Sequence, residues 1–127
     1  MLLLAGTTTA QQSEAVTVEV GPTAKLIGDG QAVQVKIKFS CEPPAEVLEA
    51  LVTVHQDEGA AFGEGFLGSS AVCDGRQHVD RVEVQALDSA FHSGEVFVSG
   101  FVLVCLDAEC VETAQGKDTR VVRVVGS

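Results

Sequence analysis

Hydrophobic and polar residues alternate along much of this chain with a period of two, which is typical of β-strands that bury one face. The clearest segment covers residues 33–41, where the apolar positions are Val33, Val35, Ile37, Phe39 and Cys41. Residues 16–20 show the same alternation and are followed by Gly21-Pro22, which favours a turn. The pattern therefore predicts two half-buried strands in the first third of the chain.

Other segments rich in β-branched residues follow, separated by turn residues. We predict strands at residues 47–56, 79–86, 95–105 and 119–125, and a weak or edge strand in the Gly-rich segment 65–73. Segment 95–105 is apolar on both faces, which indicates a central strand. About seven strands with turn signals every 8–12 residues or so are typical of one Ig-like or fibronectin-III-like antiparallel β-sandwich, and this is the predicted fold.

The amino-acid composition excludes several classes of function. A chain of 127 residues fits one domain, and without Trp or Tyr its core must consist of Val, Leu, Ile, Ala and Phe. Eight Lys and Arg against eighteen Asp and Glu give a net charge of −10, which repels nucleic acid and anionic lipid. No apolar segment approaches the roughly 20 residues of a membrane span. We expect a monomer that binds no nucleic acid and has no membrane span.

The N-terminus differs from the rest of the chain. Leu2 to Leu4 are followed by small and hydroxylated residues up to Ala10, as at the end of a signal peptide. We interpret residues 1–12 as the remnant of an export signal or as a disordered N-terminus. Residues 13–127 then form the sandwich domain.

The four cysteines allow three pairings. In the predicted sandwich, strand 33–41 ends at the pole where strand 79–86 begins, which brings Cys41 near Cys73. Strand 95–105 ends at the same pole, and Cys105 and Cys110 flank the loop that follows it. Topology therefore predicts disulfides Cys41–Cys73 and Cys105–Cys110. Such bonds persist in an oxidising compartment, so we expect a secreted protein.

Chemical sites are less well supported. Structural zinc normally uses two C-x2–4-C pairs, whereas here only Cys105 and Cys110 are close, and a redox pair needs C-x-x-C at a helix start. His55, His78 and His92 form no metal-binding motif, and no nucleophile elbow is present. We therefore expect no enzyme activity, no metal and no cofactor.

The segments FSCEPPAEVLEALVTVHQ, AVCDGRQH, LDSAFHSGEVFVSGFVLVC and DTRVVRV together resemble small secreted proteins of actinobacteria and related bacteria. This resemblance implies export and an Ig-like sandwich but no activity. The Cys105 to Cys110 spacing is also similar, more distantly, to the neocarzinostatin-type apoproteins, which hold a chromophore in a cleft beside two disulfides. Their other disulfide closes a short hairpin, whereas Cys41 and Cys73 are widely spaced here.

Two functional hypotheses follow. The first is an interaction domain whose partner contacts loops 42–46, 74–77 and 106–118, since a rigid sandwich presents recognition residues on its loops. The candidate residues are Asp74, Arg76, His78, Asp107 and Glu109. The second is a small-molecule carrier with an apolar cleft near Phe62, Phe66 and Phe101, beside the Cys105–Cys110 disulfide, although phenylalanines more often belong to a core.

Overall fold

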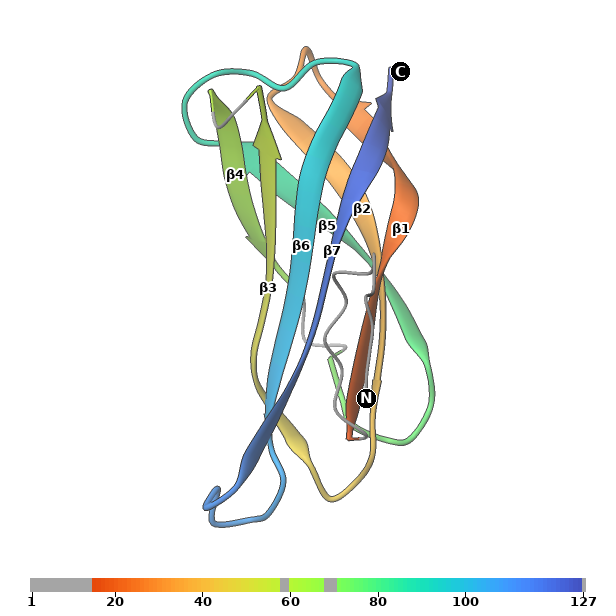
Figure 1. Cartoon of the computed structure of the whole chain (residues 1–127), viewed down its shortest axis with the longest axis vertical. Helices are drawn as coiled ribbons and strands as arrows, with labels where there is room; N and C mark the ends of the chain where they lie inside the picture. The colour runs from red at the N-terminus through yellow and green to blue at the C-terminus, as the bar shows by residue number, and fades with distance from the viewer. Residues whose placement is uncertain (1–14, 58–59, 68–70, 127) are drawn as a thin grey trace, which may run out of the picture.

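The computed structural model describes residues 15–57, 60–67 and 71–126, and this part of the chain is all-β (Figure 1). The segment interpreted as a signal remnant lies outside the described residues. The strands are β1 (Val16–Ile27), β2 (Ala32–Cys41), β3 (Glu46–Gln56), β4 (Ala61–Phe66), β5 (His78–Ala86), β6 (Gly94–Cys105) and β7 (Thr113–Val125). The predicted number of seven strands is therefore confirmed.

The strands close into a barrel with the order β1-β2-β5-β4-β3-β6-β7, in which β7 returns to pair with β1. The predicted open Ig-like sandwich is wrong in this respect. Neighbouring strands are antiparallel, as expected for β2 with β5 and for β6 with β7, and the exception is the parallel pair of β1 with β7. Figure 1 shows β7 running alongside both β6 and the upper part of β1.

Two short seams close the barrel. At the first, β4 and β5 pair only through Gly63 with Ala86 and Glu64 with Gln85. A Cβ atom on Gly63 would lie 2.3 Å from the carbonyl oxygen of Gln85, so only glycine allows this approach. At the second seam, Thr23, Ala24 and Lys25 of β1 pair with residues of β7.

Three strands had wrongly predicted bounds, β1, β4 and β7, and all three belong to these seams. The first strand does not end at Gly21-Pro22 but passes a β-bulge there and continues to Ile27, because the bulge absorbs the turn residues. The Gly-rich strand lies at Ala61–Phe66 instead of residues 65–73. The last strand begins at Thr113, six residues earlier than predicted. The other four strands begin one residue before their predicted start.

Valine side chains fill most of the barrel interior, together with Ile37, Phe39 and Phe91. All five apolar positions predicted for the segment 33–41 are buried. β6 is central, between β3 and β7, as predicted, but it buries only one face. Its valines point inward, while Phe97 is exposed and Phe101 half-buried on the outer side.

Candidate functional site

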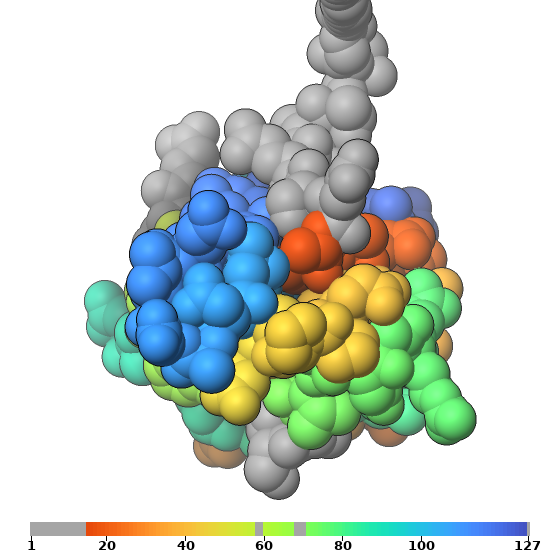
Figure 2. Space-filling model, turned by 90° about the horizontal axis from the view of Figure 1, so that it is seen from below, coloured from red at the N-terminus to blue at the C-terminus, as the bar shows by residue number. Residues whose placement is uncertain are grey.

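Both predicted disulfides form at one end of the barrel, which we call the disulfide pole. Cys41 is bonded to Cys73, at a sequence separation of 32, and Cys105 to Cys110, at a separation of 5. Glu46 lies opposite Cys105 in the register, so the start of β3 also belongs to this end. Figure 2 looks onto this pole, where the segments around residues 42–46, 71–77 and 106–112 lie side by side. The three predicted binding loops are thus neighbours, although β7 shortens the last one to residues 106–112.

Asp107 organises its own loop. Its carboxylate accepts hydrogen bonds from the backbone N–H groups of Glu109, Val111 and Glu112 at 3.0 to 3.1 Å. These bonds lower the pKa of Asp107 because they favour the ionised carboxylate, and the bond from Val111 has the largest effect. Asp107, predicted as a binding residue, therefore holds the loop between Cys105 and Cys110 in shape.

Asp74 has a similar position in the neighbouring loop. Its Oδ1 accepts the N–H of Arg76 at 2.9 Å and lies 2.8 Å from His78 Nε2. The backbone bond from Arg76 is the largest cause of a lowered pKa of Asp74. His78 also stacks on the buried Phe39, with ring centroids 5.5 Å apart. Of the five predicted binding residues, Arg76 and Glu109 are therefore left as exposed side chains at this pole without such a structural role.

A shallow pocket of about 460 Å³ lies at the disulfide pole between the segments 43–47 and 71–73. Its lining includes Pro43, Pro44, Val72 and Cys73. Neither Cys105 nor Cys110 lines this pocket. Cys73 thus lines the pocket directly, whereas the Cys105–Cys110 disulfide adjoins it only through Glu46, which lies opposite Cys105.

The three phenylalanines of the carrier hypothesis do not belong to the core. Phe62 and Phe101 are half-buried and Phe66 is 65% exposed, all on the outer side of the barrel wall. Strand register places them in a group with further outward apolar residues. We call this group the apolar face; it consists of Leu51, Phe62, Phe66, Phe97, Phe101 and Val121. It extends over β4, β3, β6 and β7.

The register shows how the apolar face is built. On β3, Leu51 lies opposite Phe66 of β4 and Phe101 of β6. Four residues further along β3, His55 lies opposite Phe62 and Phe97, and its ring is 4.6 Å from that of Phe62. Directly opposed residues of adjacent strands have their side chains in contact range on the same face. The apolar face therefore consists of two apolar rows, and the polar row of Thr53, Glu64 and Ser99 lies between them.

A pocket of about 330 Å³ lies at the edge of the apolar face, far along β3 and β6 from the disulfide pole. Its surface is mostly apolar, and its lining residues are His55, Gln56, Asp57, Glu95, Val96, Phe97 and Val121. Asp57 and Glu95 are the charged residues of this lining, which contains no Lys or Arg. The pocket lining thus combines apolar side chains with two acidic residues, and Glu95 lies opposite Arg123 of β7.

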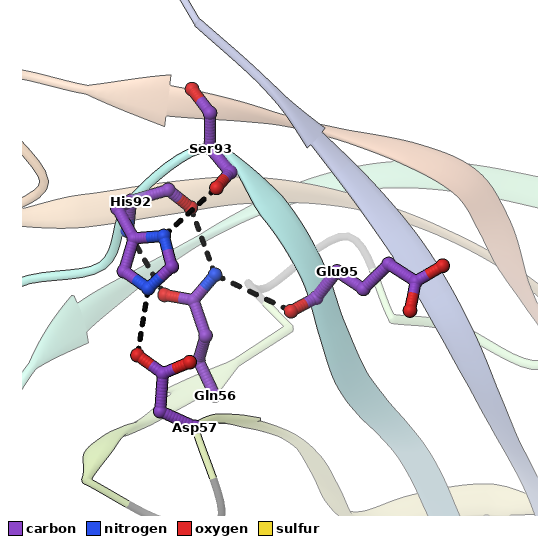
Figure 3. Close-up of polar contacts among 5 residues, drawn as sticks. All are labelled: Gln56, Asp57, His92, Ser93 and Glu95. Carbon is purple, nitrogen blue, oxygen red and sulfur yellow. Dashed lines mark hydrogen bonds and ion pairs between the residues drawn. The ribbon is translucent and has the colours of Figure 1, made fainter.

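Gln56 fixes the backbone around this pocket (Figure 3). Its side chain is buried, and its Nε2 donates to the carbonyl oxygens of His92 at 2.8 Å and Glu95 at 3.3 Å. Its Oε1 accepts the N–H of His92 at 2.9 Å. A single buried amide therefore connects the end of β3 to the loop before β6, which makes this wall of the pocket rigid.

His92 and Asp57 form an exposed pair on the same wall. His92 Nε2 lies 2.7 Å from Asp57 Oδ2, and Nδ1 lies 2.8 Å from the carbonyl oxygen of Ser93 (Figure 3). A carbonyl can only accept, so Nδ1 donates, and the carboxylate favours a second proton on Nε2. The bond to Asp57 is the main cause of a raised pKa of His92. Both nitrogens are thus occupied, and neither is positioned to take a proton from a nucleophile.

The sequence pattern carries only a weak signal for this pair, because it depends on a contact between residues 35 positions apart. In the described part of the chain, no three His, Cys, Asp or Glu side chains are grouped so that they could hold a metal ion. No helix of the described residues is long and apolar enough to cross a membrane.

Comparisons with protein-family models, with curated proteins and with solved structures find no match to this chain.

Proposed function

We propose that this protein is an exported, non-enzymatic interaction domain that binds an apolar, positively charged segment of a partner protein on its apolar face. The observation that carries this proposal is the exposure of Phe66 and Phe97, at 65% and 59%, in two apolar rows on one outer side of the barrel wall. Exposed apolar side chains that are grouped in this way mark interaction sites more often than singly scattered ones do. Aromatic side chains, Phe included, are enriched in the buried centres of protein interfaces.

The pocket supplies an anchor point for such a segment. A volume of about 330 Å³ can hold one large apolar side chain of the partner against Phe97 and Val121. Burial of one such side chain contributes about 1.5–3 kcal/mol. Because Gln56 holds the backbone of the pocket wall, little conformational entropy is lost on binding.

Charge determines the kind of partner. Asp57 and Glu95 line the pocket, and Glu64 is exposed on the outer side of β4 between Phe62 and Phe66. The net charge of −10 adds a long-range field that attracts cations and repels anions. A partner segment with Lys or Arg next to an aromatic or aliphatic residue is complementary to this surface.

Two further observations support the proposal. Two disulfides in a domain of this size fit an extracellular or periplasmic location. The His92–Asp57 pair lacks the free imidazole nitrogen that a general base requires, which supports a role other than catalysis.

The test is a selection from a random peptide display library against the purified, oxidised protein. We expect enriched peptides to combine an aromatic or aliphatic residue with Lys or Arg. Phe66→Ser and Phe97→Ser should each weaken the selected peptides by about tenfold or more, which corresponds to roughly 1.4 kcal/mol. Val79→Ser is the matched control, since Val79 is 51% exposed on β5, outside the apolar face. Peptides that tolerate both Phe substitutions, or that are acidic, would contradict the proposal.

A small-molecule carrier is the second candidate, and the pocket favours it. Its volume lies at the lower end of the range for ligand sites, so a ligand would have one or two rings. The carboxylates of Asp57 and Glu95 would select an amine over an acid. A carrier should bind 2-naphthylmethylamine but not 2-naphthoate. Loss of this binding in Phe97→Ser, together with its retention in Phe66→Ser, would favour carriage over peptide binding.

A further inference from the structure

Positive charges gather in one place on the opposite side of the barrel, on the outer surface of β1, β2 and β5. Three of the eight Lys and Arg residues of the chain, Lys25, Lys36 and Arg81, line a single hollow of about 260 Å³. Thr23, Gln34 and Val125 also contribute to its lining. We call this the cation hollow; it shares no residue with the apolar face or with the pocket beside it.

The bulge of β1 borders the cation hollow, whose lining includes Thr23, Ala24 and Lys25. The register between β1 and β2 shifts between Val20 and Ala24, so the segment around Gly21 faces Lys36 without regular pairing. A Cβ atom on Gly21 would lie only 3.2 Å from the Cβ of Lys36, so the bulged segment of β1 packs closely against this side chain. On the other side of β2, Lys36 lies directly opposite Arg81 of β5. The bulge and this cross-strand pair thus bring the cations around one depression.

These cations are not neutralised within the described part of the chain. Its ion pairs involve none of the three. Glu83, the next outward residue on β5, accepts a hydrogen bond from Gln85 at 2.7 Å, and Glu19 of β1 lies 4.0 Å from Arg120. Like charges at directly opposed positions destabilise a strand pair. The Lys36–Arg81 pair is thus unneutralised although the chain has eighteen acidic residues. A bound anion would remove the repulsion between these two side chains.

We propose that the cation hollow binds a compact oxyanion, a phosphate, sulfate or carboxylate group. The Arg81 guanidinium can hold two oxygens at once, the lysines add point charges, and Thr23 and Gln34 offer neutral hydrogen-bond donors. The net charge of −10 repels an extended polyanion but acts weakly on a small ion already inside the hollow. The ligand is therefore a free small anion.

The test is a titration of the oxidised protein with inorganic phosphate, sulfate and acetate in turn. Amide NMR chemical shifts are the readout, and chloride keeps the ionic strength constant. We expect saturable shifts for residues 23–25, 34–36 and 81, with phosphate and sulfate binding more tightly than acetate. Arg81→Gln and Lys36→Gln should each weaken phosphate binding by about tenfold. Lys117→Gln is the matched control, because Lys117 is exposed on β7 outside the hollow.

Two outcomes would overturn the proposal. Shifts that increase linearly without saturation would indicate non-specific ionic screening and no binding site. Equal shifts in Arg81→Gln and Lys117→Gln would indicate the same. A second arm measures sedimentation with vesicles of phosphatidylcholine containing phosphatidylglycerol. Binding to these vesicles without a saturable response to phosphate would assign the surface to a membrane instead of a free anion. Neither result depends on the apolar face, which Phe66→Ser tests separately.

Discussion

The buried carboxylate of Asp118 on β7 accepts a hydrogen bond from the backbone N–H of Val20 on β1, at 2.8 Å. The two strands pair through their backbones only further along, where Thr23 to Lys25 lie beside β7. The side chain of Asp118 therefore links β1 to β7 at a point where the backbones of the two strands are not paired. A polar group that is buried requires such a partner, and both groups are satisfied here.

Replacement of Asp118 by Ala should destabilise the protein. The Val20 N–H would remain buried without an acceptor, at a cost of about 1–3 kcal/mol in the free energy of unfolding. Asp118→Asn is the matched control, because its amide oxygen can still accept this bond, and it should cost less. Urea unfolding of the two variants and the parent protein measures the difference. An equal loss in both variants would mean that the charge of Asp118, and not its acceptor, stabilises this seam.

Alternation along the chain was sufficient to predict most of the barrel wall but not its closure. β2, which has the longest strict period of two, was placed within one residue, because one buried face dictates that pattern. The seams depend on Gly21 at a bulge and on Gly63 at a close contact. Glycine and proline also mark turns, so their local signal predicted strand ends where the structure has strand contacts.

Replacement of Gly63 by Ala should weaken the seam between β4 and β5. The new Cβ would lie 2.3 Å from the carbonyl oxygen of Gln85, so β4 must move away or its pairing must break. We expect a loss of about 1–3 kcal/mol in the free energy of unfolding, typical of overpacking.

Hydrogen exchange should locate this effect. Amides of β4 and of the end of β5 should exchange faster in Gly63→Ala, while those of β6 and β7 keep their protection. Gly126→Ala is the control, since its Cβ would meet only the Ser93 hydroxyl at 3.4 Å. Unchanged exchange in β4 would show that the barrel closes without this contact.

The candidate sites were harder to predict than the fold. The disulfide pairing followed correctly from strand topology, because β2 does neighbour β5 even in the closed barrel. The outward direction of Phe101 did not follow, since a strand pattern that is apolar on both faces does not reveal which face is covered. Phe66 belongs to the Gly-rich strand, whose bounds were predicted wrongly. The pair of His92 with Asp57 joins two loops that only the folded chain brings together.

The pH dependence of stability should include a contribution from His92. Its pKa is raised above the ordinary value of 6.5 by the hydrogen bond to Asp57, so the folded protein holds this proton more tightly than the unfolded chain. The stabilisation is complete below pH 6.5 and disappears as the pH rises through the folded-state pKa. We expect an NMR titration to place the pKa of His92 above that of the same residue in Asp57→Asn. A pKa of His92 that does not change in this variant would contradict the pairing.

The two disulfides should contribute unequally to stability. In the loop-entropy account the stabilisation grows with the length of the closed ring, which gives about 4 kcal/mol for the separation of 32 and about 2 kcal/mol for the separation of 5. Cys41→Ser/Cys73→Ser should therefore lower the midpoint of urea unfolding more than Cys105→Ser/Cys110→Ser.

Hydrogen exchange in the two disulfide variants distinguishes a loss of chain entropy from a loss of loop structure. Asp107 binds the backbone of residues 109, 111 and 112, so the short loop should keep much of its protection from hydrogen exchange in Cys105→Ser/Cys110→Ser. Loss of Cys41–Cys73 instead removes the tie between β2 and the segment before β5, whose remaining links include the hydrogen bond from the Gly75 N–H to the Cys41 carbonyl oxygen at 2.8 Å. A larger loss of stability from the short ring would show that the Cys105–Cys110 bond holds more of the barrel than its own loop.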